Sequence, residues 1–151
     1  IAVHPRTRDM YYSGKADWNI VKAVKESVRV PVIGGGNIFA AKDVVNMIES
    51  TGCDAVMVAR GVQGNPWIFR DFDDLINNRE PTIVTIQDKV KMIKQHLELL
   101  IKYKGEYRAM LEIRKHAAWY SKGERNASKF KNLVFTCKSQ EELLSALNIL
   151  S

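Results

Sequence analysis

The first half of the chain alternates short apolar runs with segments whose apolar residues recur at the spacing of a helix. The apolar runs, at 1–4, 30–33 and 55–58, have the length and composition of buried β-strands. Helices are predicted over 18–28, 40–50 and 66–77, the first with Asp17 as N-cap and the last with Asn65 as N-cap before Pro66. Successive strands begin about 25 residues apart, which is typical of parallel strands joined by crossover helices.

Polar residues and glycines follow each predicted strand at its carboxyl end. They are His4 and Arg6 after the first strand, 34–37 after the second, and Arg60 with Gly61 after the third. Ligands of parallel α/β folds bind on that side of the sheet, and an arginine beside a helix N-terminus suits an anion such as phosphate. The alternative is that Gly61 and Gly64 only form a turn and that Arg60 is a solvated charge.

The fold class predicted is α/β, with the last three β/α units of a TIM barrel over 1–78. A phosphate site of such barrels often lies in the loops after the last two strands. Three units alone would leave unpaired strand edges, so we expect the chain to be a fragment whose missing N-terminal part supplies the other strands. A doubly wound open sheet has the same period and remains an alternative.

A polar, proline-bearing linker is predicted over 79–84, and a small all-α bundle over 85–151. Thr85 with Asp88, and Ser139 with Glu142, have the spacing of capping boxes, while Ser128 is expected to open a third, short helix. The remaining helix is predicted from about Glu106 to Ser121. Four helices with short connections indicate a bundle.

The basic charge is concentrated in this second half. The net charge is +6, yet residues 85–132 hold twelve Lys and Arg against five Asp and Glu. On a helix, Lys115, Trp119 and Lys122 share one side, with Arg108 close to it. Cations beside an aromatic ring suit an RNA partner, whereas the alternative is a solvated basic face. Trp119 and His116 are expected in the core, and His96 has no assigned role.

The two cysteines, Cys53 and Cys137, lie in different segments without metal-ligand spacing, and Cys53 is expected to be a small core residue. We therefore expect no metal site and two reduced thiols in a cytoplasmic protein. No stretch has the length of a membrane span, so no membrane partner is expected.

Four segments of the chain are similar to one known family. The segments are 4–8 (HPRTR), 12–18 (YSGKADW), 31–38 (PVIGGGNI) and 59–67 (ARGVQGNPW). They resemble, in this order and spacing, the tRNA-dihydrouridine synthases, and the bacterial B-type branch most closely. The similarity covers nearly the whole chain but falls on the C-terminal portion of the family's sequence.

The resemblance implies an FMN-binding TIM barrel followed by a helical tRNA-binding domain. His4 would contact the flavin ring, and the phosphate of FMN would be held by residues of two neighbouring loops: Gly35, Gly36, Asn37, Ala59, Arg60 and Gly61. Arg6 would touch flavin or RNA. The RNA contacts of the helical domain would include Arg108, Arg114, Lys115 and Lys122. The family usually has Asn-Gly-Asp at 35–37 and Gly-Arg at 59–60, so contacts at 35–37 are expected from the backbone only.

The activity implied is reduction of the C5=C6 bond of a uridine in tRNA, with NADPH as electron donor to FMN. The family's proton-donating cysteine lies upstream of this chain, so the fragment alone is predicted to be inactive and to carry no catalytic residue. Two other functions stay open on the sequence: a non-catalytic RNA-binding module, and an FMN barrel that acts on a small molecule.

Overall fold

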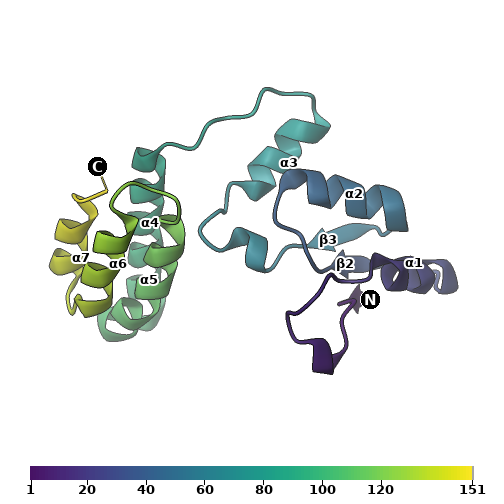
Figure 1. Ribbon diagram of the computed structural model, residues 1–151, viewed down its shortest axis with the longest axis horizontal. Helices are drawn as coiled ribbons and strands as arrows, with labels where there is room; N and C mark the ends of the chain where they lie inside the picture. Colours follow the sequence, from purple (N-terminus) through teal and green to yellow (C-terminus); the bar gives the residue numbers. More distant parts are fainter. Residues whose placement is uncertain (151) are drawn as a thin grey trace. The chain divides into compact units, whose positions relative to one another are not determined.

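A computed structural model describes residues 1–150, which form two compact units that divide between Thr82 and Ile83 (Figure 1). The first unit is mixed α/β with a small parallel sheet, and the second is helical, so the predicted mixture of α and β structure is confirmed.

The sheet of the first unit contains β1 (Ala2–Val3), β2 (Ile33–Gly35) and β3 (Ala55–Met57) in the order β1-β2-β3. Both pairs are parallel, with Ala2 opposite Ile33 and Ile33 opposite Ala55. The helices α1 (Trp18–Ser27) and α2 (Ala41–Thr51) connect the strands, and α3 (Ile68–Ile76) follows the last one. The three carboxyl ends therefore lie side by side at one edge of the sheet.

The helices of this unit cover one face of the sheet and leave the other exposed. The core joins Val21 of α1 and Met47 of α2 to Val32 and Cys53, and Val3 and Val56 of the strands pack against it. Cys53 is thus the core residue predicted from the sequence. On the opposite face, Ala2, Ile33, Ala55 and Met57 are exposed. A parallel sheet is normally buried on both faces, so this apolar face lacks the cover that such sheets have.

The second strand begins three residues later than its apolar run predicts. Pro31 has no backbone N–H, and the N–H of Val32 donates to the carboxylate of Asp54 at 2.7 Å instead of to a neighbouring strand. Lys25 holds that carboxylate at 2.7 Å, and the Lys25 hydrogen bond is the main cause that lowers the pKa of Asp54. The ladder consequently starts at Ile33.

The prediction of a helix that starts at Pro66 with Asn65 as its cap is wrong. The chain leaves β3 in a short 3-10 helix, η2 (Arg60–Val62), and α3 starts at Ile68 after Trp67. The carbonyl of Asn65 accepts from the N–H of Ile68 at 3.4 Å, so Asn65 forms a turn and its side chain does not cap the helix. A second 3-10 helix, η1 (Arg8–Met10), lies in the loop after β1. The N-cap of α1 was predicted correctly, since the carboxylate of Asp17 accepts from the N–H of Asn19.

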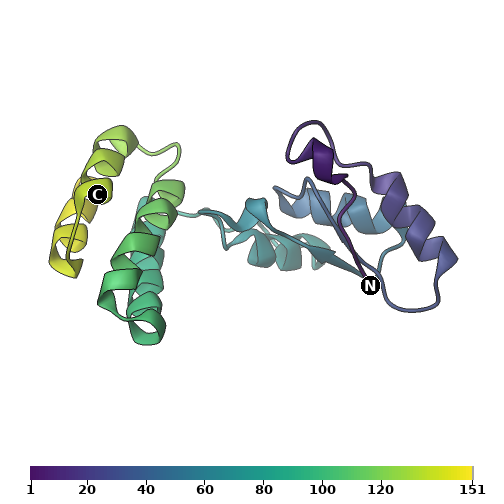
Figure 2. The ribbon, with the colours of Figure 1, turned by 90° about the horizontal axis from the view of Figure 1, so that it is seen from below.

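The second unit consists, within the described residues, of the four helices α4 (Ile86–Lys104), α5 (Glu106–Tyr120), α6 (Ala127–Thr136) and α7 (Gln140–Leu147). Successive helices pack side by side, α4 on α5, α5 on α6 and α6 on α7 (Figure 2). The core residues come from all four helices and include Ile93, Leu97, Ile113, Phe130, Val134 and Leu143.

The N-termini of the helices in this unit agree with the capping residues predicted from the sequence, with two differences. Thr85 and Asp88 form the predicted capping box, and Ser139 accepts from the N–H of Glu142. Glu142 itself bonds the N–H of Lys138 rather than that of Ser139, so the second box is incomplete. The prediction that Ser128 opens the third helix is wrong, because α6 begins at Ala127 after Asn126 in the left-handed region.

Residues 1–150 contain no grouping of His, Cys, Asp and Glu side chains suited to a metal ion. Within the same residues, no helix has both the length and the apolar character that crossing a membrane requires.

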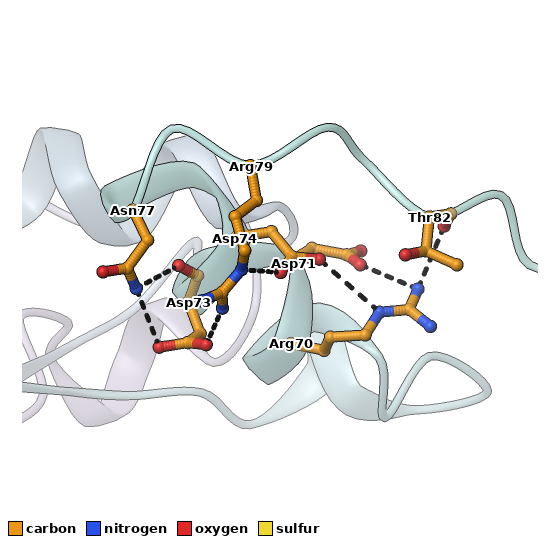
Figure 3. A network of polar contacts seen from close by, with 7 residues as sticks. All are labelled: Arg70, Asp71, Asp73, Asp74, Asn77, Arg79 and Thr82. Atoms are coloured by element: carbon orange, nitrogen blue, oxygen red, sulfur yellow. Dashed lines mark hydrogen bonds and ion pairs between the residues drawn. The ribbon is translucent and has the colours of Figure 1, made fainter.

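A network of ion pairs binds the segment after α3 back onto that helix (Figure 3). Arg79 contacts Asp73, and its Nε donates to the buried carboxylate of Asp74 at 2.8 Å. Arg70 of α3 lies 3.9 Å from Asp74 and donates to the carbonyl of Thr82 at 3.0 Å. Residues 79–82 are therefore attached to the first unit by charged groups.

We predict that Arg79→Ala lowers the free energy of unfolding of the first unit, because it leaves the buried Asp74 without its close partner. Thermal unfolding and limited proteolysis of 77–82 measure this, with Arg29→Ala, an exposed arginine, as the matched control. Asp74→Asn should recover part of the loss in the double variant. Equal stability of Arg79→Ala and Arg29→Ala would contradict the role of the network.

Candidate functional site

A cavity of about 330 Å³ lies at the carboxyl edge of the sheet. Six residues singled out in the sequence line it: His4, Arg6, Gly36, Asn37, Ala59 and Arg60. They come from the loops after β1, β2 and β3, which the parallel order of the strands places next to one another. The cavity also includes five residues to which the sequence gave no role: Tyr12, Ile38, Phe39, Met57 and Gln63.

The guanidinium of Arg6 is fixed by the chain around it. It donates to the carbonyl of Gly14 at 3.0 Å and to the side-chain oxygen of Asn37, which also accepts from the N–H of Ala16 at 3.0 Å. Its Nη1 is buried and has no hydrogen-bond partner among the described residues. A buried donor without a partner is costly, so this nitrogen is suited to an acceptor supplied by a ligand.

The guanidinium of Arg60 lies close to two aromatic rings. Its central carbon is 4.6 Å from the ring centre of Tyr12 and 5.3 Å from that of Phe39, distances at which a cation is attracted to a π face. Within residues 1–150, Arg60 forms no ion pair. The rings therefore orient its charge without neutralising it.

Two guanidinium groups thus share one cavity, and none of the residues that line it is acidic. Arginine binds phosphate and carboxylate through paired N–H groups, so the arrangement suits an anion with several oxygen atoms. His4 follows directly after β1 and is exposed. Its carbonyl accepts from the N–H of Arg6, but its ring makes no hydrogen bond among the described residues, which leaves the ring available to a ligand in the same cavity.

Two residues predicted for the site lie outside the cavity lining. Gly35 is buried within β2. Gly61 is buried in η2, where a Cβ atom would lie 2.3 Å from the carbonyl oxygen of Ile38. This close approach brings the loops after β2 and β3 into contact, so Gly61 supports the site by packing. Its direct contact with a ligand stays a prediction.

The cations predicted to bind RNA differ in their surroundings. Arg108, Lys115 and Lys122 are exposed, and the ammonium of Lys115 lies 6.0 Å from the ring centre of Trp119. Arg114 is half-buried and donates to the carbonyl of Cys137 at 2.7 Å, which ties α5 to the end of α6. This bond gives Arg114 a structural role that the sequence did not indicate.

His96 and His116 form a pair that the sequence did not predict. Their ring centres are 4.5 Å apart, between α4 and α5, and the ring of Trp119 meets His116 edge-on at 5.1 Å. Burial lowers the pKa of His116 to about 4, with a further contribution from the neighbouring His96. The signal available in the sequence was only that both histidines lie on helices, which does not reveal contact.

A profile of the dihydrouridine synthase (Dus) family matches residues 1–151, and the chain belongs to this family. It is 38% identical over 150 residues to the "Probable tRNA-dihydrouridine synthase" of Mycobacterium leprae, an alignment that covers 98% of this chain and 39% of the relative. The protein of the same name from Rickettsia conorii is 36% identical, with 89% of this chain and 41% of the relative covered.

A third relative, the "tRNA-dihydrouridine synthase B" of Pasteurella multocida, is 32% identical, with 97% of this chain and 45% of the relative covered. The chain therefore spans about two-fifths of the length of the curated relatives that it matches.

The low pKa of His116 makes the helical unit sensitive to acid. The folded state binds its proton near pH 4, whereas an unfolded histidine binds one near pH 6.5, so the free energy of unfolding falls as the pH is lowered between these values. We expect a loss of about 1–2 kcal/mol, because solvent screens a half-exposed ring. Denaturant unfolding at pH 7 and pH 4.5 measures this loss of free energy. The His116→Gln variant should lose less stability over the same pH range. The same pH dependence in both proteins would contradict the assignment.

Proposed function

We propose that this chain is the C-terminal portion of a cytoplasmic, flavin-dependent tRNA-dihydrouridine synthase of the bacterial B-type branch. It would contribute the last three β/α units of an FMN-binding TIM barrel and a helical tRNA-binding domain. The observation that carries the proposal is the cavity at the carboxyl edge of the sheet, which Arg6 and Arg60 both line and which no acidic residue lines.

The residues of the cavity fit the phosphate of FMN. Arg6 offers a buried N–H group that has no partner among residues 1–150, and Arg60 offers a charge that no described carboxylate neutralises. A cavity of about 330 Å³ is at the lower end of the range for small-ligand sites, which suits part of a cofactor rather than all of it. In the proposed complex, Gly36 and Ala59 provide backbone groups and His4 contacts the flavin ring.

The neutral side chain at 37 affects the charge of the cavity. Asn37 binds Arg6 through its amide oxygen, where an aspartate would form an ion pair. The amide keeps Arg6 in place and leaves its positive charge uncompensated, which favours an anionic ligand. Because this oxygen is already used by Arg6 and Ala16, we propose that the phosphate contacts at 35–37 come from backbone groups.

The exposed face of the sheet supports the proposal of a partial barrel. Ile33 and Met57 are 38% and 42% exposed on the face opposite the helices. In a barrel that face is the interior, packed by side chains of the remaining strands. The missing N-terminal segment of the same protein is therefore the proposed partner of this face.

The chemistry is assigned to the complete protein. Bound FMN, reduced by NADPH, would supply the hydride for the C5=C6 bond of uridine. Both cysteines of this chain are buried, at 3% and 5% exposure, and burial raises the pKa of Cys137, so neither is suited to proton donation in an open site. The catalytic cysteine is accordingly proposed to lie outside this chain, and the fragment alone to be inactive.

The charge of the helical unit supports tRNA as the substrate. Residues 83–151 carry thirteen Lys and Arg against seven Asp and Glu, and the first 82 residues carry ten of each. Such an excess attracts the phosphate backbone of a nucleic acid. We propose that Arg108, Lys115 and Lys122 contact the phosphate backbone of the tRNA. Arg6 is proposed to lie near the flavin. A small-molecule substrate would not account for this excess of basic residues.

In the complete protein, Arg60→Ala should weaken FMN binding by one to two decades, because it removes a charge-assisted contact worth about 1.5–3 kcal/mol. Quenching of flavin fluorescence on titration measures the affinity, with Arg29→Ala as the control for loss of an arginine charge from the same unit. Unchanged FMN affinity in Arg60→Ala would remove Arg60 from the proposed site.

A further inference from the structure

The helical unit contains a second pocket, of about 460 Å³, between α4 and α5. We call it the α4–α5 pocket. Its apolar wall is formed by Met92, Leu99 and Tyr120, and its polar groups belong to Gln95, His96, Glu98 and Lys102. None of these seven residues has a role in the function proposed above.

Two of the residues that line the pocket carry flat rings, Tyr120 in the apolar wall and His96 among the polar groups. The ring of His96 meets that of Tyr120 at 6.3 Å, nearly at a right angle, and its other neighbour His116 lies at 4.5 Å. Met92 is half-buried, while Leu99 is 53% exposed and widens the apolar surface toward solvent. A pocket lined by a phenol ring, an imidazole ring and a thioether suits a planar, π-bonded ligand, such as an unstacked nucleobase.

The polar groups of the pocket can read the edge of such a ligand. The side chains of Gln95 and His96 make no hydrogen bond to another described residue, although the ring of His96 contacts those of His116 and Tyr120. Burial lowers the pKa of His96, so its ring is neutral near pH 7 and presents one donor and one acceptor. Glu98 adds carboxylate oxygens, which only accept hydrogen bonds and therefore favour a ligand that carries an amino group.

The charges around the pocket indicate what the planar group is attached to. Lys102 lies in the lining itself, and the unit that surrounds it has the basic excess of thirteen cations against seven acidic groups. An anionic chain at Lys102 that carries a planar apolar group is the chemistry of single-stranded RNA. A purely apolar peptide would match the wall but not the charge.

We infer that the α4–α5 pocket binds an unpaired nucleobase with an exocyclic amino group, with the adjoining phosphate at Lys102. Gln95 and Glu98 contact the edge of the base, and the base packs against Leu99, Met92 and His96. This inference rests on the proposed function, in that it takes RNA as the ligand of the helical unit, and it adds a base-reading site to the phosphate contacts.

Oligonucleotide binding to the whole chain tests this inference. Single-stranded oligo(C), oligo(A) and oligo(U) RNAs of equal length are titrated by fluorescence anisotropy at one salt concentration. Oligo(C) and oligo(A) should bind about fivefold more tightly than oligo(U), the effect of one hydrogen bond. Glu98→Gln should reduce this preference most, because it removes the carboxylate that favours an amino group, and Gln95→Ala should also reduce it. Lys102→Ala should weaken the binding of all three RNAs to the same degree.

Matched controls lie on the same helix outside the pocket lining. Gln87→Ala and Lys94→Ala change the same residue types, both exposed, and Gln87→Ala should leave the base preference intact. The chain has three histidines, so the ring resonances of His96 report directly on occupancy by NMR. The chemical shifts of these His96 resonances should change when oligo(C) is added.

Three results would contradict the binding of a nucleobase in the α4–α5 pocket. RNA binding without base preference and without movement of the His96 resonances would overturn the pocket while leaving the helical unit an RNA binder. Base preference that survives in Gln95→Ala and equally in a Glu98→Gln variant would also overturn it. Absence of any RNA binding, with the chain folded, would overturn both the pocket and the proposed tRNA substrate.

Discussion

The parallel pairing of three short strands determines where the chemistry of the first unit can lie. Because β1, β2 and β3 run in the same direction and in sequence order, the loops that leave them meet at one edge. Arg6 and Arg60 are 54 residues apart in the chain, yet both line one cavity there. Reversal of one strand would send its loop to the opposite edge and separate the two charges.

Specific contacts join the three loops at this edge to one another. Asn37 joins the loops after β1 and β2 through its bonds from Arg6 and Ala16, and Gly61 brings the loop after β3 against the carbonyl of Ile38. The guanidinium of Arg60 contacts the rings of Tyr12 and Phe39. These contacts orient the two cations that line the cavity without neutralising either of them, which is the preorganisation that an anion site needs.

The sequence predicted elements better than contacts. The parallel sheet, the caps at Asp17 and Thr85 and the edge that carries the polar residues all follow from local patterns, and each is confirmed. The predicted start of α3 was wrong because residues 65–68 form a turn before the helix, and the local pattern of Asn followed by Pro does not distinguish such a turn from a helix cap. Tyr12 as a partner of Arg60, and the pairing of His96 with His116, depend on residues far apart in the chain, so neither could be read from spacing.

We propose that the edge of the sheet in this chain holds the phosphate of a flavin. A crystal structure of the complete protein grown with FMN is the most direct test. We expect the phosphate within hydrogen-bond distance of the guanidinium groups of both Arg6 and Arg60. A flavin whose phosphate is bound elsewhere, with this cavity left to solvent, would contradict it.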